Sequence, residues 1–365
     1  MQRLPGLDTL RAAAIVWVML FHSWVVGGLG AHFDWLSRYG WVGVDIFFVL
    51  SGFLIGSQVL APLARGERLD LIDFYRRRAY RILPAFAVVL ALYVLVPALR
   101  ELPGLAPWWQ FATFTLNLLI DYNVQPAFSH AWSLCVEEHF YLLFPLLAMG
   151  LARQRSGRAL AGVALLLVLG GIALRTALWW HDTTLDPPRN WYIEDLYFPT
   201  WARLDGLLAG VLLAALKAFR PTLWTRAQLH ATTAMWGGLV VMACAFWLFR
   251  DRLALWSNAI GWPLLSAGIG LLVFAAAGPA SALGRWRVPG AGWIAGISYS
   301  LYLIHKIAFH LVQVMLGDRL HGVVIFVVYA LAALALGSAL HLGVERPFLR
   351  LRESRAMRRA LPVVA

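Results

Sequence analysis

One arginine and one histidine share a face of the first apolar segment, and their chemistries are complementary. Arg11 and His22 stand eleven positions apart in LDTLRAAAIVWVMLFHSW. Eleven helical steps of about 100° leave roughly 20° over three turns, so the side chains share a stripe roughly 16 Å apart along the axis. Arginine is a permanent cation suited to phosphate, and histidine moves protons near neutral pH. The pair indicates a functional site, unless Arg11 only reaches lipid headgroups and His22 is a hydrogen-bonded core residue.

A second stripe, in a later apolar segment, adds a carboxylate. Ser133, Glu137 and Tyr141 follow one another at intervals of four and therefore lie on one helix face. Glu138 points about 100° away, and a helix N-terminus at the membrane interface would suit it. We therefore predict that Glu137 faces the functional cavity. Ser133 could be a nucleophile, but its place at the start of a helix favours capping.

The composition places these residues in a membrane protein. Of 365 residues, 61% are hydrophobic and only 14% are charged, a larger apolar share than soluble domains have. Apolar stretches long enough to cross a core of ~30 Å recur from end to end. We predict an all-α polytopic protein with ten transmembrane helices around a polar cavity, at residues 7–29, 41–61, 80–99, 133–151, 158–180, 200–216, 229–249, 256–278, 293–316 and 322–343. The stretch 108–120 is too short to span and is expected to be re-entrant or interfacial.

Basic residues gather on one side of these segments. The net charge is +12. Most of the basic residues between the spans follow the second, fourth, sixth or eighth span: Arg65, Arg68, Arg76, Arg77, Arg78, Arg81, Arg153, Arg155, Arg158, Lys217, Arg220, Arg226, Arg285 and Arg287. By the positive-inside rule, both termini are expected to be cytoplasmic. The charge thus reflects topology and not nucleic-acid binding. Residues 1–345 form one predicted membrane domain, its first segment too long for a signal peptide, and 346–365 form a basic cytoplasmic tail.

The remaining intramembrane polar residues sort by depth. Arg11, Arg78 and Arg81 fall at the inner face, whereas the outer half or middle holds His22, Asp45, Ser51, Ser133, Glu137, Arg203, Asp205 and His305. This distribution predicts a cavity lined by ionisable groups, with cations at its inner mouth. Secondary site candidates are Ser133, Tyr141, Asp45, Arg203, Asp205 and His305. Arg203 and Asp205 face different ways, and one is expected to pair with Glu137 or Asp45, as a structural ion pair or for catalysis.

Six strings follow one another along nearly the whole chain: GLDTLRAAAIVWVMLFH, GVDIFFVLSGFLI, FYRRRAYRILP, HAWSLCVEEHFYLLFP, ARLDGLLAG and ISYSLYLIHK. In these strings the chain resembles the acyltransferase 3 family of integral membrane O-acyltransferases. The resemblance implies an enzyme of the bacterial cytoplasmic membrane that transfers an acyl group, commonly acetyl, from cytoplasmic acyl-CoA to a hydroxyl of a glycan or glycosylated acceptor. Some relatives add an extracytoplasmic hydrolase-like domain, which this chain is expected to lack. Cys135 and His139 stand where relatives often have serine and glutamine.

The residues themselves suit that chemistry. Arg11, Arg78 and Arg81 offer charged forks for the phosphates of acyl-CoA. We predict that the thioester reaches His22, which removes the proton of the acceptor hydroxyl, while Glu137 orients or charges the imidazole. An acyl-histidine intermediate is the alternative mechanism.

Other classes of function predict different features. A transporter is expected to have repeated halves and broken helices, which the sequence lacks. A membrane protein that binds glycan without modifying it would leave the inner arginines no role beyond topology. Cys135 and Cys244 lie in predicted spans and form no metal-binding spacing, so neither a metal nor a structural disulfide is expected.

Overall fold

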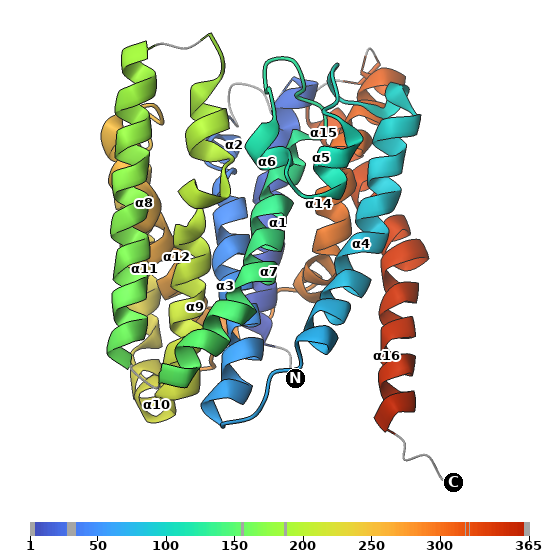
Figure 1. Ribbon diagram of the computed structural model, residues 1–365. Coiled ribbons are helices and arrows are strands. Elements are labelled where there is room, and N and C mark those ends of the chain that lie inside the picture. Colours follow the sequence, from blue (N-terminus) through green and yellow to red (C-terminus); the bar gives the residue numbers. More distant parts are fainter. Residues whose placement is uncertain are drawn as a thin grey trace.

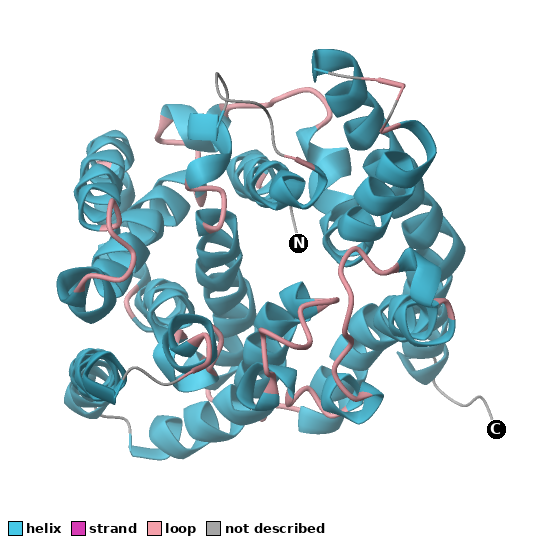
Figure 2. Cartoon of the chain, turned by 90° about the horizontal axis from the view of Figure 1, so that it is seen from above, coloured by secondary structure: helices cyan, strands magenta, loops and turns pink. Residues whose placement is uncertain are grey.

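The computed structural model describes residues 4–27, 34–154, 157–185, 188–317, 319–320 and 322–360. Within these ranges the chain is helical between its loops, with one isolated β-bridge and no strand, which confirms the all-α prediction. The long helices stand side by side in a single bundle (Figure 1). The view down the bundle shows many of these helices end on, with loops and short helices between them (Figure 2).

The helices have the following bounds: α1 Pro5–His22, α2 Asp34–Arg38, α3 Val42–Ala64, α4 Leu71–Leu95, α5 Trp108–Ala112, α6 Leu116–Leu119, α7 Trp132–Gln154, α8 Gly157–Leu185, α9 Leu204–Phe219, α10 Pro221–Gln228, α11 Ala231–Leu248, α12 Trp262–Ala276, α13 Ala282–Arg285, α14 Ala291–Leu316, α15 Gly322–Leu340 and α16 Arg346–Ala360. Short 3₁₀ turns and three π-helical turns join some of them.

A helix occupies each of the ten predicted ranges. In the described part of the chain, eight helices are long and apolar enough to cross a membrane, and a ninth is added if α9 and α10, bent by 112°, count as one span. The prediction of a polytopic membrane protein is confirmed. α1 falls outside that set, since it carries Asp8, Arg11 and His22 within 18 residues. It nevertheless stands inside the bundle, packed against α3 and α14. The stretch 108–120 forms the two short helices α5 and α6.

Local sequence sets where the site-bearing helices begin. Pro5 opens α1, where its missing N–H has no helical partner to lose. The carboxylate of Asp70 caps α4 by accepting the backbone N–H of Asp73 at 2.9 Å. Phe128 takes a left-handed backbone (φ 55°) before the 3₁₀ turn Ser129–Ala131, which leads into α7. That turn brings His130 into the bundle interior.

Close packing of α3 against α9 fixes the register of the site helices. A Cβ atom at Gly52 would lie 2.1 Å from the backbone oxygen of Leu207, and one at Gly210 would lie 2.2 Å from that of Val49. Each glycine therefore admits the backbone of the other helix, as small residues do between membrane helices.

One end of the bundle is rich in arginine and lysine. The first described residues of α1 and the last of α16 lie at this end, with α10 and the connection from α3 to α4 (Figure 1). We call it the basic end, for Arg65, Arg68, Arg76, Arg77, Lys217, Arg220 and Arg226. The region predicted as a tail is helical as far as it is described, since α16 extends to Ala360 and packs against α4.

Candidate functional site

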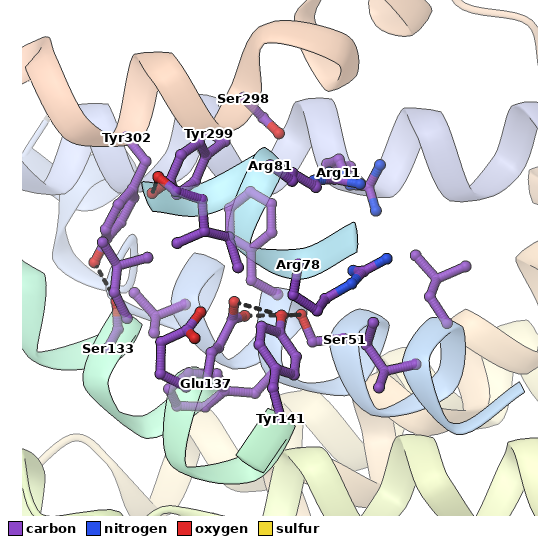
Figure 3. Close-up of a pocket in the computed structure, with 18 of the residues that line it drawn as sticks. Arg11, Ser51, Arg78, Arg81, Ser133, Glu137, Tyr141, Ser298, Tyr299 and Tyr302 are labelled. Atoms are coloured by element: carbon purple, nitrogen blue, oxygen red, sulfur yellow. Dashed lines mark hydrogen bonds between the residues drawn. The ribbon is translucent and has the colours of Figure 1, made fainter. Parts of the chain in front are cut away.

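A cavity of about 280 Å³ collects the predicted phosphate-binding arginines. We call it the arginine cavity, because Arg11 of α1 and both Arg78 and Arg81 of α4 line it. The other lining residues named below come from α3, α7 and α14. Figure 3 shows the three arginine side chains on one side of this cavity and the polar side chains of α7 across from them. The predicted convergence of these arginines is confirmed in the structure.

Few groups of the protein contact the guanidinium groups of these three arginines. In the described ranges none of the three makes a salt bridge with a carboxylate. Arg78 donates to Oε1 of Gln58 at 3.2 Å, and its Nε atom is buried without a partner. Guanidinium groups in this state retain donors for an anion.

The predicted stripe on α7 faces the same cavity. Glu137 accepts hydrogen bonds from Oγ of Ser51 and from the hydroxyl of Tyr141, both at 2.8 Å. Glu138 lines the cavity as well, so the prediction that it points away is wrong. The cavity-facing side of α7 spans two adjacent rows of side chains, which brings both carboxylates to it. Ser133 is not a cap either, because its hydroxyl contacts the carbonyl of His130 and the hydroxyl of Tyr302.

A second cavity, of about 220 Å³, holds His22. We call it the histidine cavity, for His22 and His130, and its walls also carry Lys306 and Arg252. Most of the remaining wall is aromatic: Phe21, Trp24, Trp41, Tyr122, Trp132, Tyr197, Phe198 and Tyr302. His22 ends α1 roughly 16 Å beyond Arg11. The histidine cavity therefore lies farther from the basic end than the arginine cavity does.

Two backbone carbonyls determine which nitrogen of His22 is free. Nδ1 of His305 lies 2.9 Å from the oxygen of Tyr302 and 3.2 Å from that of Leu301. Carbonyl oxygens only accept, so Nδ1 of neutral His305 carries the proton and its Nε2 holds a lone pair. Nδ1 of His22 lies 2.8 Å from that Nε2 and must donate to it. Nε2 of His22 is left with a lone pair and no hydrogen-bond partner in the described residues.

The expected contact between Glu137 and His22 is not formed. Glu137 is held by Ser51 and Tyr141 in the arginine cavity, whereas His22 pairs with His305. His305, a secondary candidate, occupies the position beside His22 that was predicted for Glu137. The reason is depth. Ser133 contacts Tyr302, which lies in the wall shared by the two cavities. Glu137 lies more than one helical turn farther along α7, on the side of the arginine cavity.

The passage expected from Arg11 to His22 is divided into two cavities. Val44 and Tyr302 line both, so their side chains form the shared wall. The hydroxyl of Tyr302 bonds Oγ of Ser133 at 2.6 Å and the carbonyl oxygen of His130 at 2.8 Å. The side chain of Tyr302 thus belongs to both cavity linings, and one side-chain hydroxyl and one backbone carbonyl hold it there.

Three of the secondary candidates form buried ion pairs outside both cavity linings. Arg203 donates to Asp45 at 2.6 Å, which confirms one of the predicted pairings, and its guanidinium lies 3.7 Å from the ring centre of Trp262. Asp205 pairs with Arg175 at 2.8 Å. Arg175 also donates to the carbonyl of Asn258 at 2.7 Å. These ion pairs link α3, α8 and the start of α9.

Sequence reasoning overlooked several residues of the histidine cavity. His130 and Lys306 stand within the strings that were singled out, but received no role. The signal for Lys306 was its position inside a predicted span, where a charged side chain indicates function. Arg175 carried the same signal, since it lies inside the predicted span 158–180, and it also received no role. Glu101 lies between predicted spans and had no comparable signal. Across the described residues, no group of three or more histidine, cysteine or acidic side chains is arranged to hold a metal ion.

Residues 4–342 match a family model described as "Acyltransferase domain". The O-acetyltransferase OatA of Staphylococcus aureus is 30% identical over 320 residues, which is 83% of this chain and 50% of that protein. The peptidoglycan O-acetyltransferase OatA of Listeria monocytogenes is 28% identical over 325 residues, 82% of this chain and 48% of its own length. The chain spans about half the length of these curated relatives. No solved structure gives a significant match.

Proposed function

Because this chain belongs to the acyltransferase domain family, we propose that it is a membrane O-acyltransferase that moves an acyl group from acyl-CoA to a hydroxyl of a glycan. One observation carries the proposal. A cavity with three guanidinium groups shares a wall with a cavity in which a histidine nitrogen is free to take a proton. The relatives are named as O-acetyltransferases, one of them of peptidoglycan, which favours acetyl as the acyl group and a cell-wall glycan as the acceptor.

The arginine cavity is the proposed entrance for the donor. The phosphates of acyl-CoA are multiply charged, and Arg11, Arg78 and Arg81 supply planar cationic forks with unused donors. The pantetheine arm would extend past Glu137 toward Tyr302. Its amide N–H groups can bond the free lone pairs of that carboxylate. In this proposal Glu137 helps to seat the donor and has no direct part in proton transfer.

The histidine cavity is the proposed place of reaction. The thioester carbonyl enters once the side chain of Tyr302 swings aside, which breaks its hydrogen bonds to Oγ of Ser133 and to the backbone oxygen of His130. Nε2 of His22 takes the hydroxyl proton as the acceptor oxygen attacks the carbonyl carbon. His305 fixes the tautomer that makes this nitrogen basic. The proton is then given to the departing thiolate of CoA.

The same nitrogen also suits the alternative mechanism. Nε2 of His22 could attack the thioester and form an acyl-histidine, which the acceptor hydroxyl then resolves. The two mechanisms differ in kinetics. Direct transfer requires both substrates to be bound together, whereas an acyl-enzyme releases CoA before the acceptor binds. Stopping the reaction with acid in the absence of acceptor, followed by mass spectrometry of the peptide that contains His22, separates them.

The basic end is the proposed cytoplasmic face. Short connections rich in lysine and arginine stay on the cytoplasmic side of a bilayer. The donor then enters from the side on which acyl-CoA is made, and the acceptor reaches His22 from the other side. Membrane-impermeant labelling of single cysteines at Arg226 and at Arg250, in intact cells and in inverted vesicles, tests this orientation.

Purified protein in lipid nanodiscs, given acetyl-CoA labelled in the acetyl group, tests the proposed activity. We expect label to pass to a glycan hydroxyl or, without acceptor, to appear slowly as acetate. A protein that binds the donor with micromolar affinity yet never breaks the thioester, with or without glycan, would refute the proposed function.

A further inference from the structure

A lysine in the histidine cavity has no role in the function proposed so far. Lys306 follows His305 on α14, is only 3% exposed and lines the same cavity as His22. Its Nζ atom lies 3.4 Å from Oε1 of Glu101. That distance is longer than an ordinary charge-assisted hydrogen bond of about 2.7–2.9 Å. In the described residues the ammonium has no closer partner.

Other residues hold Glu101, the counter-ion of Lys306, in place. Glu101 accepts a hydrogen bond from the hydroxyl of Tyr93 at 2.8 Å and one from the backbone N–H of Phe128 at 3.2 Å. Both carboxylate oxygens are therefore engaged before Lys306 approaches. The carboxylate holds the ammonium at the cavity without using up its three donors. Ammonium donors thus remain for a group inside the cavity.

Stability does not explain this pair. Burying two charges is unfavourable, and one long contact offsets little of that penalty, so two apolar side chains of similar size would pack at least as well. A charged residue kept inside a membrane-spanning helix indicates a function in the cavity it lines. The other cation there, Arg252, is engaged already, since its guanidinium lies 4.8 Å from the ring centre of Trp41 and it donates to the hydroxyl of Tyr192.

We propose that Lys306 is a catalytic residue, whose ammonium stabilises the negative charge on the thioester carbonyl oxygen during acyl transfer. This inference rests on the proposed function. As the acceptor oxygen bonds to the carbonyl carbon, its proton passes to Nε2 of His22 and the carbonyl π electrons move to oxygen. The ammonium donates a hydrogen bond to that oxyanion. Collapse re-forms the C=O bond and breaks the C–S bond, and the thiolate of CoA takes the proton from His22.

The arrangement explains why the counter-ion is loosely held. A lysine bonded tightly to Glu101 would have its charge cancelled and its position fixed away from the substrate. At 3.4 Å the charge is retained and Nζ can move toward an oxyanion as one forms. Electrostatic groups of this kind act through differential binding, because they favour the transition state over the neutral carbonyl.

A double substitution separates catalysis from structure. Lys306→Met alone leaves Glu101 buried without a counter-ion and can unfold the protein for that reason. Lys306→Met combined with Glu101→Gln removes both charges together, and the Gln side chain can still accept from Tyr93. Glu101→Gln alone retains the ammonium. Each variant is measured in nanodiscs for kcat, for KM of the acceptor, for acetyl-CoA affinity and for thermal unfolding.

We expect the double variant to fold and to bind acetyl-CoA like the parent, but to lose about 100- to 1000-fold in kcat, as enzymes do when one oxyanion donor is removed. Glu101→Gln alone should lose much less. Recovery of the parent kcat in the double variant would show that the lysine only balances a buried charge, and would overturn the inference. A rise in acceptor KM at unchanged kcat would also overturn it, since Lys306 would then bind an anionic acceptor. Absence of turnover in the parent protein is a different result, which counts against the proposed function.

Discussion

The arginine cavity and the histidine cavity adjoin each other but are built from different chemistry. The first combines three permanent cations with the carboxylates Glu137 and Glu138. The second has imidazoles, an ammonium and a guanidinium within mostly aromatic walls, and no carboxylate among its lining residues. Permanent charges with unused donors suit the binding of a polyanion. A lone pair on an imidazole suits proton transfer.

This difference implies a division of labour along the bundle axis. Changes in the arginine cavity should alter donor affinity and leave the chemical step nearly intact. Changes in the histidine cavity should reduce kcat and leave donor affinity nearly intact, since a group that acts only in the transition state does not appear in ground-state binding. The wall at Val44 and Tyr302 marks the boundary between the two effects.

The largest effect is expected at His22. His22→Ala removes the proposed base and should lower kcat by about 1000-fold or more, since general bases contribute up to about 10⁴-fold. Acetyl-CoA affinity should stay within about twofold, because the nucleotide binds in the other cavity. Turnover of labelled acetyl-CoA and equilibrium binding are the two measurements. His230→Ala, at an exposed position between α10 and α11, is the matched control. Parent-like turnover in His22→Ala would show that the histidine cavity takes no part in the reaction.

A smaller loss is expected at His305, which acts through His22. His305→Leu removes the acceptor that fixes the tautomer of His22 and should lower kcat by roughly 100-fold, less than the loss of the base itself. His305→Gln places an amide oxygen where Nε2 accepts and should restore most of that loss. The pH profile of kcat should change shape in the Leu variant and recover in the Gln variant. His310→Leu on the same helix is the control. Equal losses of kcat in His305→Leu and His305→Gln would show that His305 contributes only packing.

The arginines should show the opposite pattern. Arg78→Ala or Arg81→Ala removes one charge-assisted contact of about 1.5–3 kcal/mol, so acetyl-CoA affinity should fall by roughly ten- to a hundredfold. Lysine should rescue poorly if the planar fork matters. The same substitutions should lower the affinity for a donor that lacks the 3′-phosphate by a smaller factor. Arg77→Ala, on the same helix but paired with Asp73 at the surface, serves as the control. Unchanged affinity in both variants would mean that the donor binds elsewhere.

The smallest effect is expected at Glu137. Glu137→Gln retains an oxygen for one of its two hydrogen bonds, from Ser51 or Tyr141, and loses only a charge that lies in a different cavity from the base. We expect a change of less than about fivefold in kcat, with most of any effect in donor affinity. Glu138→Gln, on the adjacent row of α7, is the matched comparison. If kcat for Glu137→Gln instead fell as far as for His22→Ala, the two cavities would form one catalytic unit and their separation would be wrong.

Much of the fold could be read from local patterns. Apolar stretches with helical spacing gave ten ranges, and each holds a helix. The stripe of Ser133, Glu137 and Tyr141 lies along one cavity-facing side of α7, although Ser133 turns to Tyr302 rather than capping the helix. Spacing along a helix follows from its backbone hydrogen bonds, which are the same in every protein. Predictions that used only this spacing were therefore reliable, except for the angular width of the face on α7 that includes Glu138.

Contacts between helices could not be obtained in this way. The His22–His305 pair joins residues 283 positions apart. Lys306 of α14 contacts Glu101, which lies in the loop that precedes α5. The predicted spans placed Glu137 and His22 at similar depths, but spacing within a helix does not give the offset of one helix along another, and that offset places Glu137 in the arginine cavity and His22 in the histidine cavity.

The sequence by itself determined that this is an all-α membrane protein of the acyltransferase family, with Arg11 and His22 on one helix about 16 Å apart. Only the tertiary structure decided that Arg11 and His22 line separate cavities, that His305 fixes the free nitrogen of His22, and that Lys306 adjoins it. The reason is that rotation and register between helices depend on packing across the whole bundle, as at Gly52 and Gly210. A shift of one residue there would turn a different set of side chains toward each cavity.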